Sequence, residues 1–188
     1  DILPHILDRE RGVCQTLIIS PPRCGKTTLL RDMIRLLSDG TQGFAGVTVG
    51  VADERSEIGA CYLGEPQNDL GVRTDVLDGC PKAQGMMMLI RTMAPQVVAV
   101  DEIGSREELE AMEYAANCGC RLIATVHGSS FQDLLTKPVL KKMVEERMFD
   151  RFILLNSRQN PGNTYCIMDG TGKVIWQRRG EGKEIGKD

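Results

Sequence analysis

Short apolar runs alternate with stretches of helical periodicity along most of this chain. The apolar runs, each typical of a buried strand, are residues 16–19, 46–52, 97–100, 122–126 and 152–155. Apolar residues recur at helical spacing in residues 26–37, 82–93, 107–118 and 134–149. Pro138 must begin or interrupt the last of these helices. This alternation predicts an α/β fold in which helices flank a mainly parallel central sheet.

The segments outside this alternation predict a hairpin, a turn and a long loop. Residues 165–168 and 174–177 flank a Gly-rich turn and predict a C-terminal β-hairpin. Residues 160–163 predict a further turn. Residues 59–79 are polar and Gly-rich, which predicts a long loop, and such loops in compact domains are often functional. We expect the Met86–Met88 run to fill the core, because methionine adapts to irregular gaps.

Length and composition are those of a globular domain. The 188 residues suit one core, so we interpret residues 1–180 as one domain and residues 181–188 as a polar tail. The opening Asp-Ile-Leu-Pro, without an initiator Met, favours an excised domain whose N-terminal neighbour is missing. A formal charge of -3 argues against a broad nucleic-acid surface. No apolar run is long enough for a transmembrane helix, and seven cysteines without paired Cys-x-x-Cys spacing favour reduced thiols in the cytosol.

A phosphate-binding pattern lies between the first apolar run and the first helix. Residues 20–27 read Ser-Pro-Pro-Arg-Cys-Gly-Lys-Thr, which fits Gly-x4-Gly-Lys-[Ser/Thr] except that Ser20 replaces the first Gly. In such a loop the Lys (Lys26) reaches the β- and γ-phosphates and the Thr (Thr27) ligates Mg²⁺. The pattern predicts a nucleoside triphosphate, ATP with Mg²⁺, unless a Gly/Pro turn contains Lys-Thr by chance. The predicted binding residues are Pro22, Arg23, Cys24, Gly25, Lys26, Thr27 and Thr28.

A second pattern adds two carboxylates. Residues 97–102 are four apolar residues followed by Asp101 and Glu102, as in a Walker B sequence. We expect Asp101 to hold Mg²⁺ through its water shell and Glu102 to orient and polarise the attacking water. The alternative is a solvated acidic pair that ends a strand.

Two more predicted strands end in polar residues. Asp53-Glu54-Arg55-Ser56-Glu57 follows one, and Thr125 and His127 end the other. Ligands of open parallel sheets bind beyond the carboxyl ends of the strands, so we expect these groups to face the same triphosphate. Glu54 would supply a second acidic group for the metal waters, unless its segment is only a solvated loop. Thr125 and His127 would sense the γ-phosphate, unless the His is only structural.

Arginines are the expected partners of the developing γ-phosphate charge. Arg73 and Arg91 are the candidates, acting either in the same chain or from a neighbouring subunit.

Several strings together resemble the stage III sporulation protein AA family of endospore-forming bacteria. They lie at Leu17–Asp32, Asp53–Glu57, Arg73–Asp78, Cys80–Lys82, Met88–Arg91, Val100–Gly104 and Ala124–Gly128. The family is similar in turn to the ATPases of type II and type IV secretion and of pilus machines. The resemblance implies a RecA-like P-loop NTPase fold with a Walker A sequence, an Asp box (53–57), a Walker B sequence and a His box (125–128).

The resemblance also implies partners and a location. In the secretion ATPases a separate N-terminal domain precedes the motor, and hexameric rings clamp ATP between subunits. A homohexamer is therefore implied for the full-length protein. So is a cytoplasmic location in the mother cell, peripheral to membrane-embedded sporulation channel components. Two departures from the pattern are Ser20 and the Asp101-Glu102 pair, where many secretion ATPases have Gly-Glu.

Three functions follow from these observations. The first is a Mg²⁺-dependent ATPase motor that energises assembly of, or transport through, a channel between mother cell and forespore. The second is a nucleotide-dependent scaffold with weak turnover. The third is a RecA-like ATPase stimulated by nucleic acid, which is disfavoured because the chain has few aromatic residues and only short basic pairs at 141–142 and 178–179.

Overall fold

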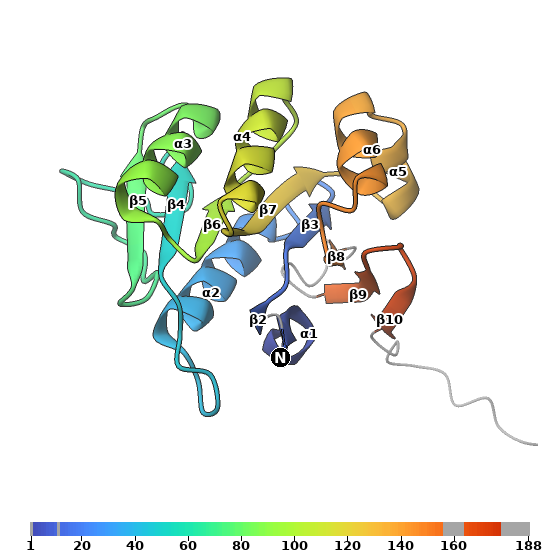
Figure 1. Ribbon diagram of the computed structural model, residues 1–188, viewed down its shortest axis with the longest axis horizontal. Coiled ribbons are helices and arrows are strands. Elements are labelled where there is room, and N and C mark those ends of the chain that lie inside the picture. The colour runs from blue at the N-terminus through green and yellow to red at the C-terminus, as the bar shows by residue number, and fades with distance from the viewer. Residues whose placement is uncertain (1, 11, 156–163, 178–188) are drawn as a thin grey trace, which may run out of the picture.

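An eight-stranded sheet forms the centre of the fold (Figure 1). This computed structural model describes residues 2–10, 12–155 and 164–177, so the expected turn at 160–163 and tail at 181–188 lie outside the described residues. The strand order is β10-β9-β8-β3-β7-β6-β4-β5. The strands are β3 (Thr16–Ser20), β4 (Val49–Asp53), β5 (Thr74–Asp78), β6 (Val97–Val100), β7 (Arg121–His127), β8 (Arg151–Leu155), β9 (Thr164–Asp169) and β10 (Val174–Gln177).

All strands from β8 to β5 in this order pair in parallel, whereas β9 and β10 pair antiparallel at the other edge. The predicted α/β fold with a mainly parallel sheet and a C-terminal hairpin is therefore confirmed.

Helices cover both faces of the sheet (Figure 1). The main helices are α2 (Lys26–Asp39), α3 (Lys82–Met93), α4 (Arg106–Asn117), α5 (Phe131–Leu135) and α6 (Pro138–Glu145). A short helix, α1 (Leu3–Ile6), precedes a two-stranded ribbon of β1 (Leu7–Asp8) and β2 (Gly12–Val13). Buried side chains of α1 and α2 share one hydrophobic cluster, and those of α3 to α6 share the other. The sheet thus separates two cores.

Alternate residues of the central strands enter opposite cores. Leu17 and Ile19 of β3 pack with the α3 to α6 cluster, while Ile18 packs with α2. Every residue of β3, β4 and β6 is buried. A strand covered on both faces needs apolar side chains on both, which explains the continuous apolar runs in the sequence.

Two of three expectations about the elements were wrong in part. The segment 59–79 contains the edge strand β5, which escapes notice because it has only two apolar residues between two aspartates, and charged side chains are common on exposed edges. The helical stretch expected over 134–149 is divided between two helices, and Pro138 begins the second, as expected. Met86 is buried as expected, but Met88 is 50% exposed.

The topology brings the polar strand ends together. Strands β3, β7, β6 and β4 are consecutive neighbours and parallel, so their carboxyl ends lie at one edge of the sheet. Each of the four segments singled out in the sequence therefore opens onto this edge. Among the described residues, no helix combines the length and apolar character that crossing a bilayer requires.

Candidate functional site

The phosphate-binding sequence forms a turn between β3 and α2. Gly25, the residue before the helix, has a φ of 86°, and Arg23 has a φ of 61°. A positive φ at position 25 explains its glycine. Ser20 is a fully buried residue of β3 and is not among the described residues with positive φ. A serine therefore fits where the general pattern has its first glycine.

The groups with which this loop can bind an anion are mainly its backbone amides and not most of its side chains. The first N–H groups of α2 have no acceptor within the helix, and the helix dipole favours an anion beside them. Cys24 is 1% exposed and its Sγ lies 3.7 Å from the carbonyl oxygen of Pro22, so its thiol faces inward. Pro22 has no N–H to donate. Arg23 and Thr28 are exposed.

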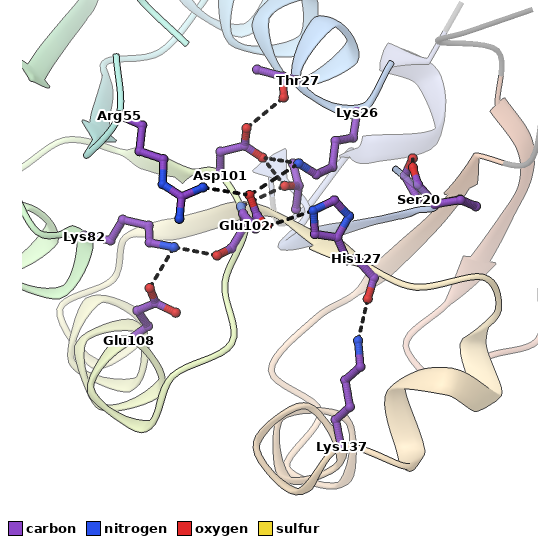
Figure 2. A network of polar contacts seen from close by, with 12 residues as sticks. Ser20, Lys26, Thr27, Arg55, Lys82, Asp101, Glu102, Glu108, His127 and Lys137 are labelled. Atoms are coloured by element: carbon purple, nitrogen blue, oxygen red, sulfur yellow. Dashed lines mark hydrogen bonds and ion pairs between the residues drawn. The ribbon is translucent and has the colours of Figure 1, made fainter. Parts of the chain in front are cut away.

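Lys26 and Thr27 lie against the carboxylate of Asp101, the residue directly after β6 (Figure 2). The Thr27 hydroxyl donates to Oδ2 of Asp101 over 2.8 Å, and the Lys26 ammonium lies 3.6 Å from Oδ1 of the same residue. Asp101 is 9% exposed. A hydroxyl and a carboxylate side by side supply the oxygen donors that Mg²⁺ prefers, so these residues fit the expected metal.

Thr125 lies at the expected strand end, but its hydroxyl has partners within the protein. It is fully buried, and its hydroxyl donates to Asp101 while accepting a 2.9 Å hydrogen bond from the backbone N–H of Glu102. The hydroxyl proton and one of the acceptor sites of the oxygen are thus used within the protein. Thr125 braces the end of β6 against β7 and is not available as a phosphate sensor.

Glu102 is the centre of an ion-pair network (Figure 2). Its Oε1 lies 2.8 Å from Nε2 of His127, and its Oε2 lies 3.8 Å from the Lys26 ammonium and 3.7 Å from the guanidinium of Arg55. Glu102 has a φ of 56°, an unfavourable conformation for a residue with a side chain. Such backbone outliers concentrate at functional sites, where surrounding contacts hold them. Strands β3, β6 and β7 therefore bring Lys26, Glu102 and His127 together as expected.

Two lysines that sequence reasoning missed hold the backbone at this network. Lys82, the first residue of α3, donates to the carbonyl oxygen of Glu102 over 2.5 Å. Lys137, just before α6, donates to the carbonyl oxygen of His127 over 2.7 Å. Arg55 is the third cation that the sequence analysis left without a role. The position of Arg55 within the Asp box could have indicated a role at the site. No local sequence pattern indicated such a role for Lys137.

Two acidic residues at the end of β4, Asp53 and Glu54, have different roles. Asp53 is 3% exposed and accepts hydrogen bonds from the backbone N–H groups of Glu57, Ile58 and Gly59 at 2.9, 3.0 and 2.7 Å. Its carboxylate therefore organises the loop. Glu54 is exposed and lines a pocket together with Arg55, Lys82, Asp101 and Glu102. Glu54 thus faces the site, as expected, together with Arg55 and Glu57 of the same segment.

Replacing Asp53 by Ala is expected to destabilise the fold by about 2–4 kcal/mol, because it leaves buried or half-buried N–H groups without an acceptor. Urea unfolding followed by circular dichroism measures the change. Asp75→Ala is the matched control, since Asp75 is an exposed residue of the neighbouring strand β5. Equal stability of the two variants would contradict the role given to Asp53.

Neither candidate arginine reaches the site within this chain. The Arg73 guanidinium donates to the carbonyl oxygens of Ser38 and Asp39 at 2.7 and 3.3 Å. These residues end α2, about 20 Å from its first turn at 1.5 Å per residue. The Arg91 guanidinium stacks over the ring of Tyr114, 5.8 Å from its centre. The expectation of phosphate contacts from Arg73 and Arg91 in the same chain was therefore wrong.

Comparison with known proteins finds similarity in sequence. Residues 1–175 match the sequence profile described as "Sporulation stage III, protein AA". Over 179 residues the chain is 46% identical to "Stage III sporulation protein AA" of Bacillus subtilis (strain 168). This alignment covers 95% of the chain but 58% of that protein.

Comparison with solved structures finds similarity in fold. The Legionella pneumophila ATPase DotB has a TM-score of 0.55 and 20% identity, covering 75% of this chain and 40% of that one. The VirB11 ATPase of the Brucella suis type IV secretion system, solved in complex with sulphate, has a TM-score of 0.54 and 14% identity. That match covers 82% of this chain and 47% of the other. The RecA-like fold of secretion ATPases, expected from the sequence, is confirmed.

Proposed function

Because the chain belongs to the sporulation stage III protein AA family, we propose that it is a Mg²⁺-dependent ATPase of the secretion type. One observation carries the proposal. The ammonium and hydroxyl of a phosphate-binding loop meet an Asp-Glu pair at one sheet edge, where His127 pairs with the Glu. The reaction is attack of water on the γ-phosphorus of ATP, which breaks the bond to the bridging oxygen and yields ADP and phosphate.

The binding roles follow from which groups face the loop. The amides of Gly25 to Thr28 and the Lys26 ammonium bind the phosphates, and Thr27 and Asp101 hold Mg²⁺. The bound metal supplies neutralisation of charge on the phosphate oxygens. In the nucleotide-free protein the Lys26 ammonium pairs with Asp101 and Glu102. When a phosphate becomes the partner of Lys26 instead, both carboxylates are released from this pairing.

The hydrolytic roles fall to groups around the pocket. Glu102 orients and polarises the attacking water, because it is the partly exposed carboxylate next to the loop. His127 pairs with Glu102 and senses the γ-phosphate. Glu54, exposed at the same pocket, supplies a second acidic group for the metal waters. Arg55 is available to meet negative charge, since its side chain is 70% exposed and lies 3.7 Å from Glu102.

The wider setting is proposed from the family. The full-length protein would form a homohexamer on the cytoplasmic face of a membrane complex in the mother cell. There ATP hydrolysis would drive assembly of, or transport through, the channel to the forespore. An arginine of a neighbouring subunit would complete each site, because Arg73 and Arg91 are both engaged elsewhere in their own chain.

Mg·ATP is expected to stabilise the protein against unfolding. A ligand that binds the native state at about 100 times its Kd adds about 2.7 kcal/mol, which shifts the Tm of a domain of this size by roughly 5 °C or more. Thermal unfolding with ATP and Mg²⁺, with ATP and EDTA, and with AMP measures the effect. Equal Tm values in all three solutions would contradict the proposal.

The scaffold function remains the second candidate because of a specific observation. Both carboxylate oxygens of Glu102 already have partners, because Oε1 contacts His127 and Oε2 lies within 3.8 Å of Lys26 and Arg55, so an attacking water would compete with these contacts. ATP affinity and turnover measured on the same full-length preparation separate the two functions. Tight binding with turnover no faster than that of the Glu102→Gln variant would identify the scaffold.

A further inference from the structure

The largely buried Lys82–Glu108 ion pair lies next to the backbone carbonyl of Glu102, the proposed catalytic residue (Figure 2). The Lys82 ammonium contacts a carboxylate oxygen of Glu108 at 2.8 Å and the carbonyl oxygen of Glu102 at 2.5 Å. Only 16% of the Lys82 side chain and 10% of the Glu108 side chain are exposed. Lys82 thus links helix α3 to Glu102, two residues after strand β6, and to helix α4.

Local preferences argue against a lysine at this position. Lys82 is the first residue of α3, where the helix dipole disfavours a positive charge. Partial burial adds a desolvation cost to that unfavourable interaction. The unfavourable interaction with the helix dipole and the desolvation cost need compensation. Glu108 and the carbonyl oxygen of Glu102 supply it by contacting the Lys82 ammonium.

Glu108 also fixes the loop that leaves the site. Its Oε2 accepts hydrogen bonds from the N–H groups of Gly104 and Ser105 at 2.7 and 2.9 Å, and Ser105 completes the capping box of α4. Burial alone would raise the pKa of Glu108. Hydrogen bonds from Lys82, Ser105 and Gly104 outweigh burial and hold that pKa below its usual value. The carboxylate is therefore charged at neutral pH, as the pair with Lys82 requires.

Glu102 needs such support. Its φ of 56° lies in the left-handed region, which is unfavourable for a residue with a side chain. Its N–H donates to Thr125 and its carbonyl accepts from Lys82, so both peptide groups beside the strained residue are held. The conformation directs the carboxylate to the side of the chain where Lys26, Arg55 and His127 lie.

We propose that Lys82, paired with Glu108, is a positioning residue that holds the backbone of Glu102 in the conformation required for hydrolysis. The inference rests on the proposed function, because it takes Glu102 as the group that orients the water. Lys82 acts through Glu102, because its ammonium is held by the Glu102 carbonyl oxygen and by Glu108. Its loss therefore changes the rate of hydrolysis and not the affinity for nucleotide.

The test compares turnover and nucleotide affinity in the full-length protein carrying Lys82→Met. Turnover is expected to fall about 10- to 100-fold, as for misplacement of a catalytic group, with KM and ATP affinity within about threefold of normal. Lys82→Arg keeps a charged donor and is expected to restore part of the rate. Lys141→Met, which removes an exposed lysine paired with Glu145 on α6, is the control and should leave both constants unchanged. Normal turnover in Lys82→Met, or a matching loss of ATP affinity, would overturn the proposal.

A second variant keeps the test independent of folding. Lys82→Met alone leaves Glu108 as a buried carboxylate without a cation, which is strongly destabilising. The double variant Lys82→Met/Glu108→Gln removes both charges and retains an acceptor for the α4 cap. It is expected to stay folded by circular dichroism and to show the same selective loss of turnover. A folded double variant with normal turnover would refute the inference.

A readout without ATP separates this inference from the proposed function. If the unaltered protein releases no phosphate from ATP, the proposed function fails. Hydrogen exchange in peptides from residues 101–105 then decides the structural claim on its own. Faster exchange of the Glu102 and Ile103 amides in Lys82→Met than in Lys141→Met supports the positioning role of Lys82, and equal exchange overturns it.

Discussion

Replacing Glu102 by Gln is expected to lower the turnover number for ATP about 100-fold or more, the usual contribution of a positioned proton acceptor. The amide keeps the shape of the carboxylate but cannot polarise water or attract the cations around it. Lys26, Arg55 and His127 all lie within 3.8 Å of the Glu102 carboxylate, so its charge is central to the network. ATP affinity should stay within about threefold of normal or rise, because Lys26 loses a competing partner.

The matched control for Glu102→Gln is Glu110→Gln. Glu110 is an exposed residue of α4 whose carboxylate pairs only locally with Arg106, four residues away. The same change of charge there should leave turnover and affinity unaltered. Steady-state phosphate release and equilibrium binding of a fluorescent ATP analogue give the two quantities. Equal turnover of the two variants would remove Glu102 from the chemistry.

Replacing Lys26 by Ala is expected to weaken ATP binding about 10- to 100-fold, the value of a charge-assisted hydrogen bond of about 1.5–3 kcal/mol. Turnover should fall as well, since the same ammonium meets the γ-phosphate as negative charge develops. The stability of the nucleotide-free protein should change little, because the Lys26 contacts with Asp101 and Glu102 are long, at 3.6 and 3.8 Å. Isothermal titration with ATP and Mg²⁺ measures the affinity.

Arg35→Ala provides the control on the same helix. Arg35 pairs with Asp32 on the exposed side of α2, away from the loop, so its removal deletes one positive charge without touching the site. Undiminished ATP affinity in Lys26→Ala, or an equal loss in Arg35→Ala, would contradict the phosphate-binding role of Lys26.

The sequence predicted the parts of the site that depend on the ends of strands. Buried parallel strands have apolar side chains on both faces, so polar residues directly after β4 and β6 stood out. The strand order then brought Asp53, Asp101 and His127 to one edge, as the sheet rule requires. The phosphate-binding loop was recognisable despite Ser20, because the left-handed turn that needs glycine is at Gly25.

The sequence could not predict contacts that depend on how helices pack over the sheet. Lys82 and Glu108 are 26 positions apart and meet only because α3 and α4 lie side by side on one face. Arg73 was misplaced for the same reason, since its partners at the end of α2 are 35 and 34 positions away. Thr125 occupied the expected strand end, but its hydroxyl points to Asp101, which no local pattern reveals.

The most direct test of the proposed function is the release of inorganic phosphate from ATP by the full-length protein. The rate is measured with Mg²⁺ and with excess EDTA, in the unaltered protein and in Glu102→Gln. We predict release that requires Mg²⁺ and that the substitution lowers about 100-fold or more. No release from the unaltered protein in the presence of Mg²⁺, or release that survives the loss of the Glu102 carboxylate, would contradict the assignment of this site to ATP hydrolysis.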